Sequence, residues 1–231
     1  MGTGISLDLV DPPAAALAEE IFDWFREVDR QFSTYIVDSE VSRAGQQPPS
    51  ERLQFVLDRC SALWTATGGY FDAYATGRLD PSGYVKGWSV QVASDRLVAA
   101  GCPNHCVNAG GDVRVRGVSE SGEPWRVGIR HPFQVDQVCA VVGGTDLAIA
   151  TSGVYERGHH VFDPFTGEPP RGLSSVTVVG TDLGDADAYA TAALAMGRAG
   201  IDWLATLADH ESAVVTDDGE FFTSAGFPAV L

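Results

Sequence analysis

The spacing of apolar residues changes halfway along this chain, and that change restricts its fold more than any other feature. Apolar side chains recur at helical spacing on one face of residues 14–30, and residues 51–66 repeat the pattern. Residues 85–100 predict a third helix, which Gly101 would end in the manner of a C-terminal cap. The first half of the chain is therefore expected to be rich in helices.

The second half follows a different period. Short β-type runs alternate with turns from about residue 105 onward, as in VNAGGDVRVRG, WRVGIRH and SSVTVVG. One strong helix, from about 185 to 196, interrupts them, with Asp185 as its expected N-cap and Gly197 as its stop. A helix-rich first half followed by a mixed or antiparallel sheet predicts the α+β class. With 231 residues the chain is expected to form a single domain over residues 1–231.

The charge balance excludes several classes of partner. The chain carries 31 acidic and 15 basic residues, a formal charge of −16, whereas binding to nucleic acid or to an anionic membrane depends on clustered lysine and arginine. Charged residues or glycines interrupt every apolar segment, so no membrane insertion is expected. The N-terminus lacks the basic and apolar regions of a signal peptide and has no lipobox, which predicts a cytoplasmic protein.

The cysteines do not form a recognisable framework. Cys60, Cys102, Cys106 and Cys139 are too few for a disulfide scaffold in a chain of this length. Cys102 and Cys106 belong to a CPNHC motif that has no second pair of ligands. All four are expected to be reduced and structural, and a metal site formed by Cys102, His105 and Cys106 is the alternative.

Two stretches could hold an anionic ligand. Because the chain is so acidic, such a ligand must be held by a bound cation or by backbone N–H groups. Asp187 and Thr191 stand at i and i+4 of the expected helix, so a carboxylate and a hydroxyl share one face and suit Mg²⁺. Asp80, Gly83 and Lys86, the only lysine of the sequence, lie in a turn that leads into a helix. Each stretch also has a simpler interpretation. Asp187 could be a solvated acid on a capped helix, and Lys86 could be a solvated lysine beside an ordinary turn.

Three further motifs carry candidate residues. The pair Gly110 and Gly111 indicates close approach of a ligand or of a neighbouring strand. His159 and His160 precede a turn, where they could supply a general base, a metal ligand or no function. Ser152 lacks the G-x-S-x-G elbow that presents a nucleophilic serine, so it is not expected to act as one.

The set and the order of these motifs resemble the ApbE family of FAD:protein FMN transferases. The resemblance runs along nearly the whole chain through MGT, FSTYIVDSEVSR, TGGYFDA, LDPSGYVKGWSV, VNAGGDVRVRG, IATSGVYERGHHVFDPFTG and DADAYATAALAMG. It implies a single ApbE-like, T-fold-like domain. It also implies a Mg²⁺-dependent enzyme that splits FAD, attaches FMN through a phosphoester bond to a threonine of a target flavoprotein and releases AMP.

The resemblance also assigns roles to single residues. It implies Gly83, Asp187 and Thr191 as ligands of Mg²⁺, and it places His160 beside the reacting phosphate, so His160 and Asp187 are the catalytic candidates. The implied contacts with FAD are Met1, Tyr35, Tyr70, Phe71, Asp72, Asp80, Lys86 and Val161. The glycines and the aspartate of NAGGD would shape the flavin pocket.

The sequence departs from the family pattern inside the chain. Typical members have a longer segment between the blocks that match Asp72 and Asp80, whereas only seven residues separate them here. The short segment could alter adenine binding, the choice of target or the need for a dimer partner, and both a monomer and a homodimer are open. Ala190 stands where some members supply an acid, which could weaken Mg²⁺ binding. A FAD pyrophosphatase, a non-catalytic FAD carrier and an inherited scaffold are the alternative functions.

Overall fold

Seven strands form one antiparallel sheet in the computed structural model, which describes residues 3–11, 16–134, 136–153 and 161–230. The strand order is β1-β2-β3-β6-β7-β8-β9, and each neighbouring pair is antiparallel. The strands are β1 Ile5–Leu9, β2 His105–Ala109, β3 Asp112–Arg116, β6 Asp146–Gly153, β7 Leu173–Gly180, β8 Glu211–Thr216 and β9 Phe221–Thr223. A separate hairpin pairs β4 Trp125–Arg130 with β5 Val138–Gly144.

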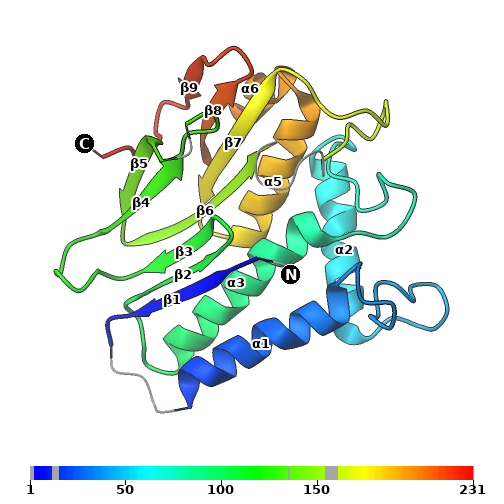
Figure 1. The fold of residues 1–231 in the computed structure, drawn as a ribbon, viewed down its shortest axis with the longest axis horizontal. Helices are drawn as coiled ribbons and strands as arrows, with labels where there is room; N and C mark the ends of the chain where they lie inside the picture. Colours follow the sequence, from blue (N-terminus) through cyan, green and yellow to red (C-terminus); the bar gives the residue numbers. More distant parts are fainter. Residues whose placement is uncertain (1–2, 12–15, 135, 154–160, 231) are drawn as a thin grey trace.

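Helices cover one face of this sheet (Figure 1). They are α1 Leu17–Phe32, α2 Glu51–Ala66, α3 Ser82–Ala99, α5 Leu183–Met196 and α6 Ala199–Leu204. Helices α3 and α5 pack side by side against the strands, and α1 and α2 contact α3 from outside (Figure 1). Among the described residues, no helix combines the length and the apolar character that crossing a membrane requires.

The two faces of the sheet carry separate hydrophobic cores, because successive strand residues point to opposite faces. Val107 of β2 and Val178 of β7 face the helices and belong to the larger core. Val113 and Val115 of β3 face the other way and pack with Val142 of the β4–β5 hairpin. Helix α5 packs against α3 and against strands β6 and β7, and most of its alanines are buried. The site described below therefore rests on helices that are anchored in the larger core.

The structure confirms the α+β class and refines the expected elements. Helix α2 has the predicted bounds, and α3 begins three residues earlier than predicted, at Ser82. The prediction of Asp185 as an N-cap is wrong: the helix begins at Leu183, and the Asp182 side chain accepts a hydrogen bond from the Asp185 backbone N–H. Strand β1 and helix α6 were not predicted, because each is too short for its period to stand out.

The CPNHC segment is structural. The ring nitrogens of His105 lie 2.8 Å from the Cys102 carbonyl oxygen and 2.7 Å from Ser94 Oγ, so both have hydrogen-bond partners. Cys106 packs with the smaller core on the opposite face of the sheet. The alternative of a metal site at these residues is therefore wrong. Burial raises the pKa of the Cys60 and Cys106 thiols to about 12, which keeps them protonated and unreactive.

Candidate active site

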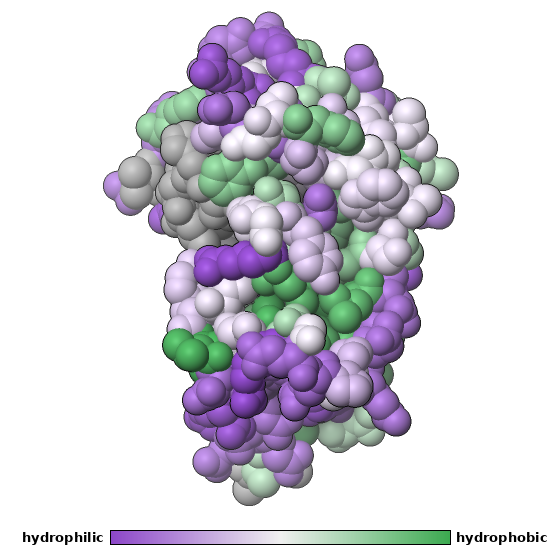
Figure 2. Space-filling model, turned by 90° about the vertical axis from the view of Figure 1, so that its right-hand side faces the viewer, coloured by the Kyte–Doolittle hydropathy of each residue, from purple (hydrophilic) through white to green (hydrophobic). Residues whose placement is uncertain are grey.

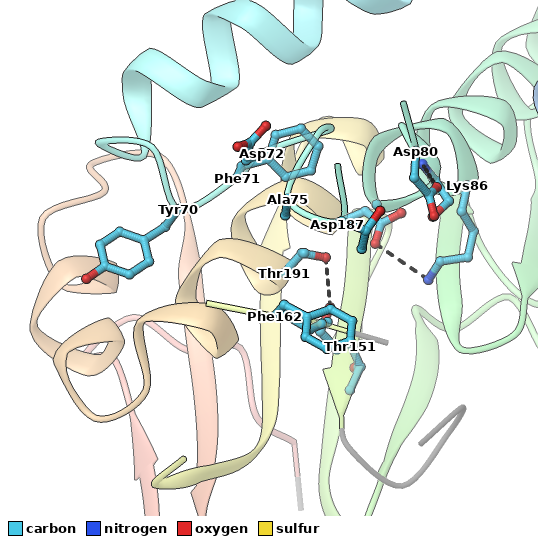
Figure 3. A pocket seen from close by; sticks show the side chains of 15 residues that line it. Tyr70, Phe71, Asp72, Ala75, Asp80, Lys86, Thr151, Phe162, Asp187 and Thr191 are labelled. Atoms are coloured by element: carbon cyan, nitrogen blue, oxygen red, sulfur yellow. Dashed lines mark hydrogen bonds and ion pairs between the residues drawn. The ribbon is translucent and has the colours of Figure 1, made fainter. Parts of the chain in front are cut away.

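A pocket opens where the first turn of α3 meets α5 and the end of β6 (Figure 3). Its enclosed part measures about 110 Å³, whereas a pocket that encloses a whole cofactor usually measures roughly 300–1,000 Å³. The lining residues are Tyr70, Phe71, Asp72, Ala75, Thr76, Asp80, Ser82, Gly83, Lys86, Thr151, Ser152, Val161, Phe162, Asp187 and Thr191. The enclosed part fits a cation and phosphates, and a larger ligand would extend over the open surface.

Three charged side chains meet at one side of this pocket. Lys86 of α3 lies between Asp112, the first residue of β3, and Asp187 of α5. Figure 3 shows its contact with Asp187. Its Nζ is 2.6 Å from Asp112 Oδ2 and 3.5 Å from Asp187 Oδ1. Asp112 is 0% exposed and Asp187 is 1% exposed, and Lys86 is the only lysine in the sequence. One cation is thus shared by two buried carboxylates.

Asp187 is held by the backbone of the neighbouring helix. The Gly87 N–H donates a hydrogen bond of 3.0 Å to Asp187 Oδ2. Only glycine permits this approach, because a Cβ at position 87 would lie 2.2 Å from the Leu183 carbonyl oxygen. Burial raises the pKa of Asp187 well above its usual value and the Asp112 carboxylate raises it further, whereas Lys86 and the Gly87 N–H lower it.

Two hydroxyls stand one helical turn beyond the charged group. Thr191 follows Asp187 on the same face of α5, as the i, i+4 spacing predicted, and its Oγ1 lies 3.2 Å from Ser152 Oγ of β6. Gly83 of α3 packs closely against Thr191 and Phe71. A Cβ at position 83 would lie only 3.3 Å from Thr191 Oγ1 and 3.2 Å from the Phe71 ring. Helix α5 and strand β6 thus bring a carboxylate and two hydroxyls to one wall.

Aromatic and acidic residues form the mouth of the pocket. Asp72 and Asp80 each accept a hydrogen bond from the backbone N–H two residues later, at 2.7 and 3.1 Å, which orders the turn that joins α2 to α3. The ring of Tyr70 packs edge-on against Phe165, with 4.9 Å between the ring centroids. Val161 is buried at the opposite rim.

Most of the candidate residues that the structure describes therefore meet in one pocket. Tyr35 is 93% exposed and does not line the pocket. Met1 and His160 lie outside the described residues. The residues that the pocket brings together are Tyr70, Phe71, Asp72, Asp80, Gly83, Lys86, Val161, Asp187 and Thr191.

Comparison with known proteins identifies the family of this chain. A model described as the ApbE family matches residues 1–77 and 73–215. This chain belongs to the ApbE family. The FAD:protein FMN transferase of Vibrio cholerae is 30% identical over 269 aligned residues, which cover 86% of this chain and 80% of the relative. The FAD:protein FMN transferase of Rhodobacter capsulatus is 36% identical over 176 residues, which cover 67% of this chain and 33% of that relative.

Solved structures confirm the ApbE-like fold. The flavin transferase ApbE from Vibrio cholerae superposes with a TM-score of 0.87 at 27% sequence identity, covering 100% of this chain and 96% of that one. The ApbE protein of Thermotoga maritima shares the fold, with a TM-score of 0.83 at 24% identity. The described residues thus form the ApbE-like architecture that the sequence motifs implied.

The turn between α2 and α3 is the place where this ApbE chain differs from its family. The two parts of the family match overlap at residues 73–77, inside this turn. Beside it the structure has an apolar hollow, and Figure 2 shows this hydrophobic floor above a hydrophilic lower rim. Leu53 and Leu57 of α2 line the hollow together with Tyr74 and Leu79 of the turn.

Two residues of the site were missed: Ser152, which lines the pocket, and Asp112, which contacts the lining residue Lys86. Asp112 was expected only to shape the flavin pocket, yet it makes the shorter ion pair with Lys86. A feature of the sequence could have identified Asp112: it is an acidic residue directly after a Gly-Gly hairpin turn, at a strand position that faces the helices. Ser152 was considered only as a nucleophile, yet its hydroxyl pairs with Thr191. Its signal was a small polar residue at the end of a buried apolar strand.

The donor set of this wall fits the Mg²⁺ ion that the ApbE resemblance implies. Mg²⁺ prefers hard oxygen ligands and keeps several waters, and Asp187, Thr191 and Ser152 offer a carboxylate and two hydroxyls. Asp112 Oδ1 is buried without a hydrogen-bond partner among the described residues, so the site retains negative charge that a cation would balance. Ala190 supplies no side-chain ligand. The described residues also include no group of three or more acidic, histidine or cysteine side chains that could hold a metal ion on their own.

The raised pKa of Asp187 predicts a pH-dependent effect on stability. The pKa of Asp187 is higher in the folded protein than the value near 3.8 expected for the unfolded chain. The protonated carboxyl therefore stabilises the folded state at low pH. This stabilisation is lost as pH rises from the unfolded pKa towards the folded pKa. Asparagine does not titrate. In the presence of EDTA, the free energy of unfolding of Asp187→Asn minus that of the native protein should therefore increase between pH 5 and pH 8. Urea titrations measure this difference, and a difference that is independent of pH would contradict the assignment.

Proposed function

We propose that this protein is a Mg²⁺-dependent FAD:protein FMN transferase, which cleaves FAD, attaches FMN to a threonine of a target flavoprotein and releases AMP. The observation that carries the proposal is the pocket wall on which Lys86, Asp187 and Thr191 converge in a member of the ApbE family. The relatives from Vibrio cholerae and Rhodobacter capsulatus are both named FAD:protein FMN transferase.

The diphosphate of FAD has a favourable place in this pocket. Lys86 supplies a positive charge, and Gly83 in the first turn of α3 lines the same space and is proposed to offer its backbone N–H. A protein with a formal charge of −16 repels an anionic dinucleotide unless the site compensates locally. Bound Mg²⁺ would add positive charge next to the diphosphate and lower the barrier to breaking it. Its proposed ligands are Gly83, Asp187 and Thr191.

The proposed reaction is an in-line transfer. The threonine hydroxyl oxygen forms a bond to the phosphorus on the FMN side of FAD, the bond from that phosphorus to the oxygen of AMP breaks, and the threonine proton leaves. His160 is proposed as the acceptor of that proton. Lys86 would stabilise the negative charge that AMP takes with it. The aromatic residues Tyr70 and Phe71 are proposed to contact the dinucleotide at the mouth of the pocket.

One incubation separates the transferase from its alternatives. The purified protein is mixed with FAD and Mg²⁺, with and without a threonine-containing acceptor peptide, and AMP, FMN and peptide mass are followed by chromatography and mass spectrometry. We expect AMP together with a peptide whose mass has increased by one FMN residue, and neither product after EDTA is added. AMP with FMN alone would indicate a pyrophosphatase, and saturable FAD binding without AMP would indicate a carrier.

A further inference from the structure

We infer that Asp112 is a positioning residue that anchors the ammonium of Lys86 and thereby keeps Asp187 available to Mg²⁺. The inference deepens the proposed function and rests on it, because it takes Asp187 as a ligand of the metal. It assigns a role to the buried carboxylate of Asp112, which takes no part in the proposed reaction.

The backbone fixes the place of Asp112. Strands β2 and β3 are joined through Gly110 and Gly111, whose φ angles of 59° and 96° form a two-residue hairpin turn. Asn108 Oδ1 accepts a hydrogen bond of 3.0 Å from the Gly111 N–H and closes this turn. Asp112 pairs with Ala109 directly after the turn, and its side chain points towards α3. Its carboxylate therefore has a rigid position in the sheet.

The energetics make Lys86 the necessary partner of this carboxylate. A buried charge is costly unless it is paired, and Asp112 is 0% exposed while its Oδ1 has no hydrogen-bond partner among the described residues. The distance of 2.6 Å between Lys86 Nζ and Asp112 Oδ2 marks a close ion pair. The corresponding distance to Asp187 is 3.5 Å. Of these two carboxylates, Asp112 of the sheet is thus the closer partner of Lys86.

The difference between these two distances decides which carboxylate is open to a metal. An ammonium and a divalent cation compete for the same carboxylate oxygens, because both need close contact with negative charge. Without the charge of Asp112, Lys86 would turn to the next carboxylate, Asp187, whose other oxygen is already bound by the Gly87 N–H. The lysine would then occupy the oxygen that Mg²⁺ needs. Asp112 therefore supports metal binding through Lys86 rather than as a ligand.

The test measures Mg²⁺ binding without FAD, by isothermal titration calorimetry on the full chain. Asp112→Asn keeps the shape of the side chain and removes its charge, and we expect the Kd for Mg²⁺ to rise about tenfold, within the usual range of coupling between contacting residues. Asp146→Asn is the control, since Asp146 is also a β-strand aspartate paired with a buried cation, but its ion pairs are with Arg114 and Arg116 and not with Lys86. The control should leave the Kd unchanged.

A crystal structure of Asp112→Asn separates an effect through Lys86 from a direct effect of charge. The inference requires Lys86 Nζ to move to within about 3 Å of Asp187. A raised Kd with Nζ still distant from Asp187 would overturn it, and so would an unchanged Kd. If the native chain binds no Mg²⁺ at all, the metal in the proposed function fails as well, whereas native binding with an unaffected variant refutes the inference alone.

The native protein offers a second measurement that needs no folded variant. Because Lys86 is the only lysine, selective ¹⁵N labelling of lysine gives a single Nζ signal in an NMR spectrum. If Asp112 anchors the ammonium, this signal stays protected from exchange with water when Mg²⁺ is added. Loss of protection on Mg²⁺ binding would show that Asp187 was the anchor and would overturn the inference.

Discussion

Replacing Asp187 with asparagine is expected to lower the rate of FAD cleavage by about a thousandfold, the scale of losing a central electrostatic group in an active site. Asparagine keeps the shape of the side chain but removes the charge that Mg²⁺ requires. It also leaves Lys86 with Asp112 as its carboxylate partner in the pocket. The release of AMP from FAD at saturating Mg²⁺, followed by chromatography, measures this loss.

The neighbouring Asp185 provides the control for this variant. It lies in the first turn of the same helix, but it pairs with Arg59 and does not line the pocket. Asp185→Asn should therefore keep AMP release within about threefold of the native rate, since a partly exposed ion pair contributes little to stability. Full Mg²⁺-dependent turnover by Asp187→Asn would show that the metal site lies elsewhere.

Replacing Gly87 with alanine is expected to lower the free energy of unfolding by about 3 kcal/mol, at the upper end of the usual cost of overpacking. The added Cβ would lie 2.2 Å from the Leu183 carbonyl oxygen and 2.8 Å from Asp187 Cβ. Helices α3 and α5 would have to separate, and the hydrogen bond from the Gly87 N–H to Asp187 would lengthen. Urea unfolding followed by circular dichroism measures the loss.

Gly4→Ala is the control for the chemical change itself. No atom lies within 4 Å of a Cβ built at Gly4, and the backbone there does not require glycine. Its effect on the free energy of unfolding should stay within about 0.5 kcal/mol. Equal stability of the two variants would mean that α3 and α5 do not pack as closely as described, and the position of Asp187 would then have to be revised.

Much of the local structure could be predicted from the sequence, because it depends on residues close together in the chain. Helix α2 has the bounds that its apolar period predicted, and Asp187 and Thr191 face one pocket as their i, i+4 spacing required. The ApbE motifs identified the family, which the family model and the relatives confirmed. The assignment of Met1 and His160 stays a prediction, since both lie outside the described residues.

The sequence by itself determined the family, the periods of the helices and strands, and the face of α5 that carries Asp187 and Thr191. Only the tertiary structure decided that Asp112, rather than Asp187, is the closer partner of Lys86, and that Ser152 joins Thr191. The physical reason is distance along the chain. These contacts join β3 to α3 and β6 to α5, so their geometry depends on how α3 and α5 pack on the sheet and not on any local spacing of residues.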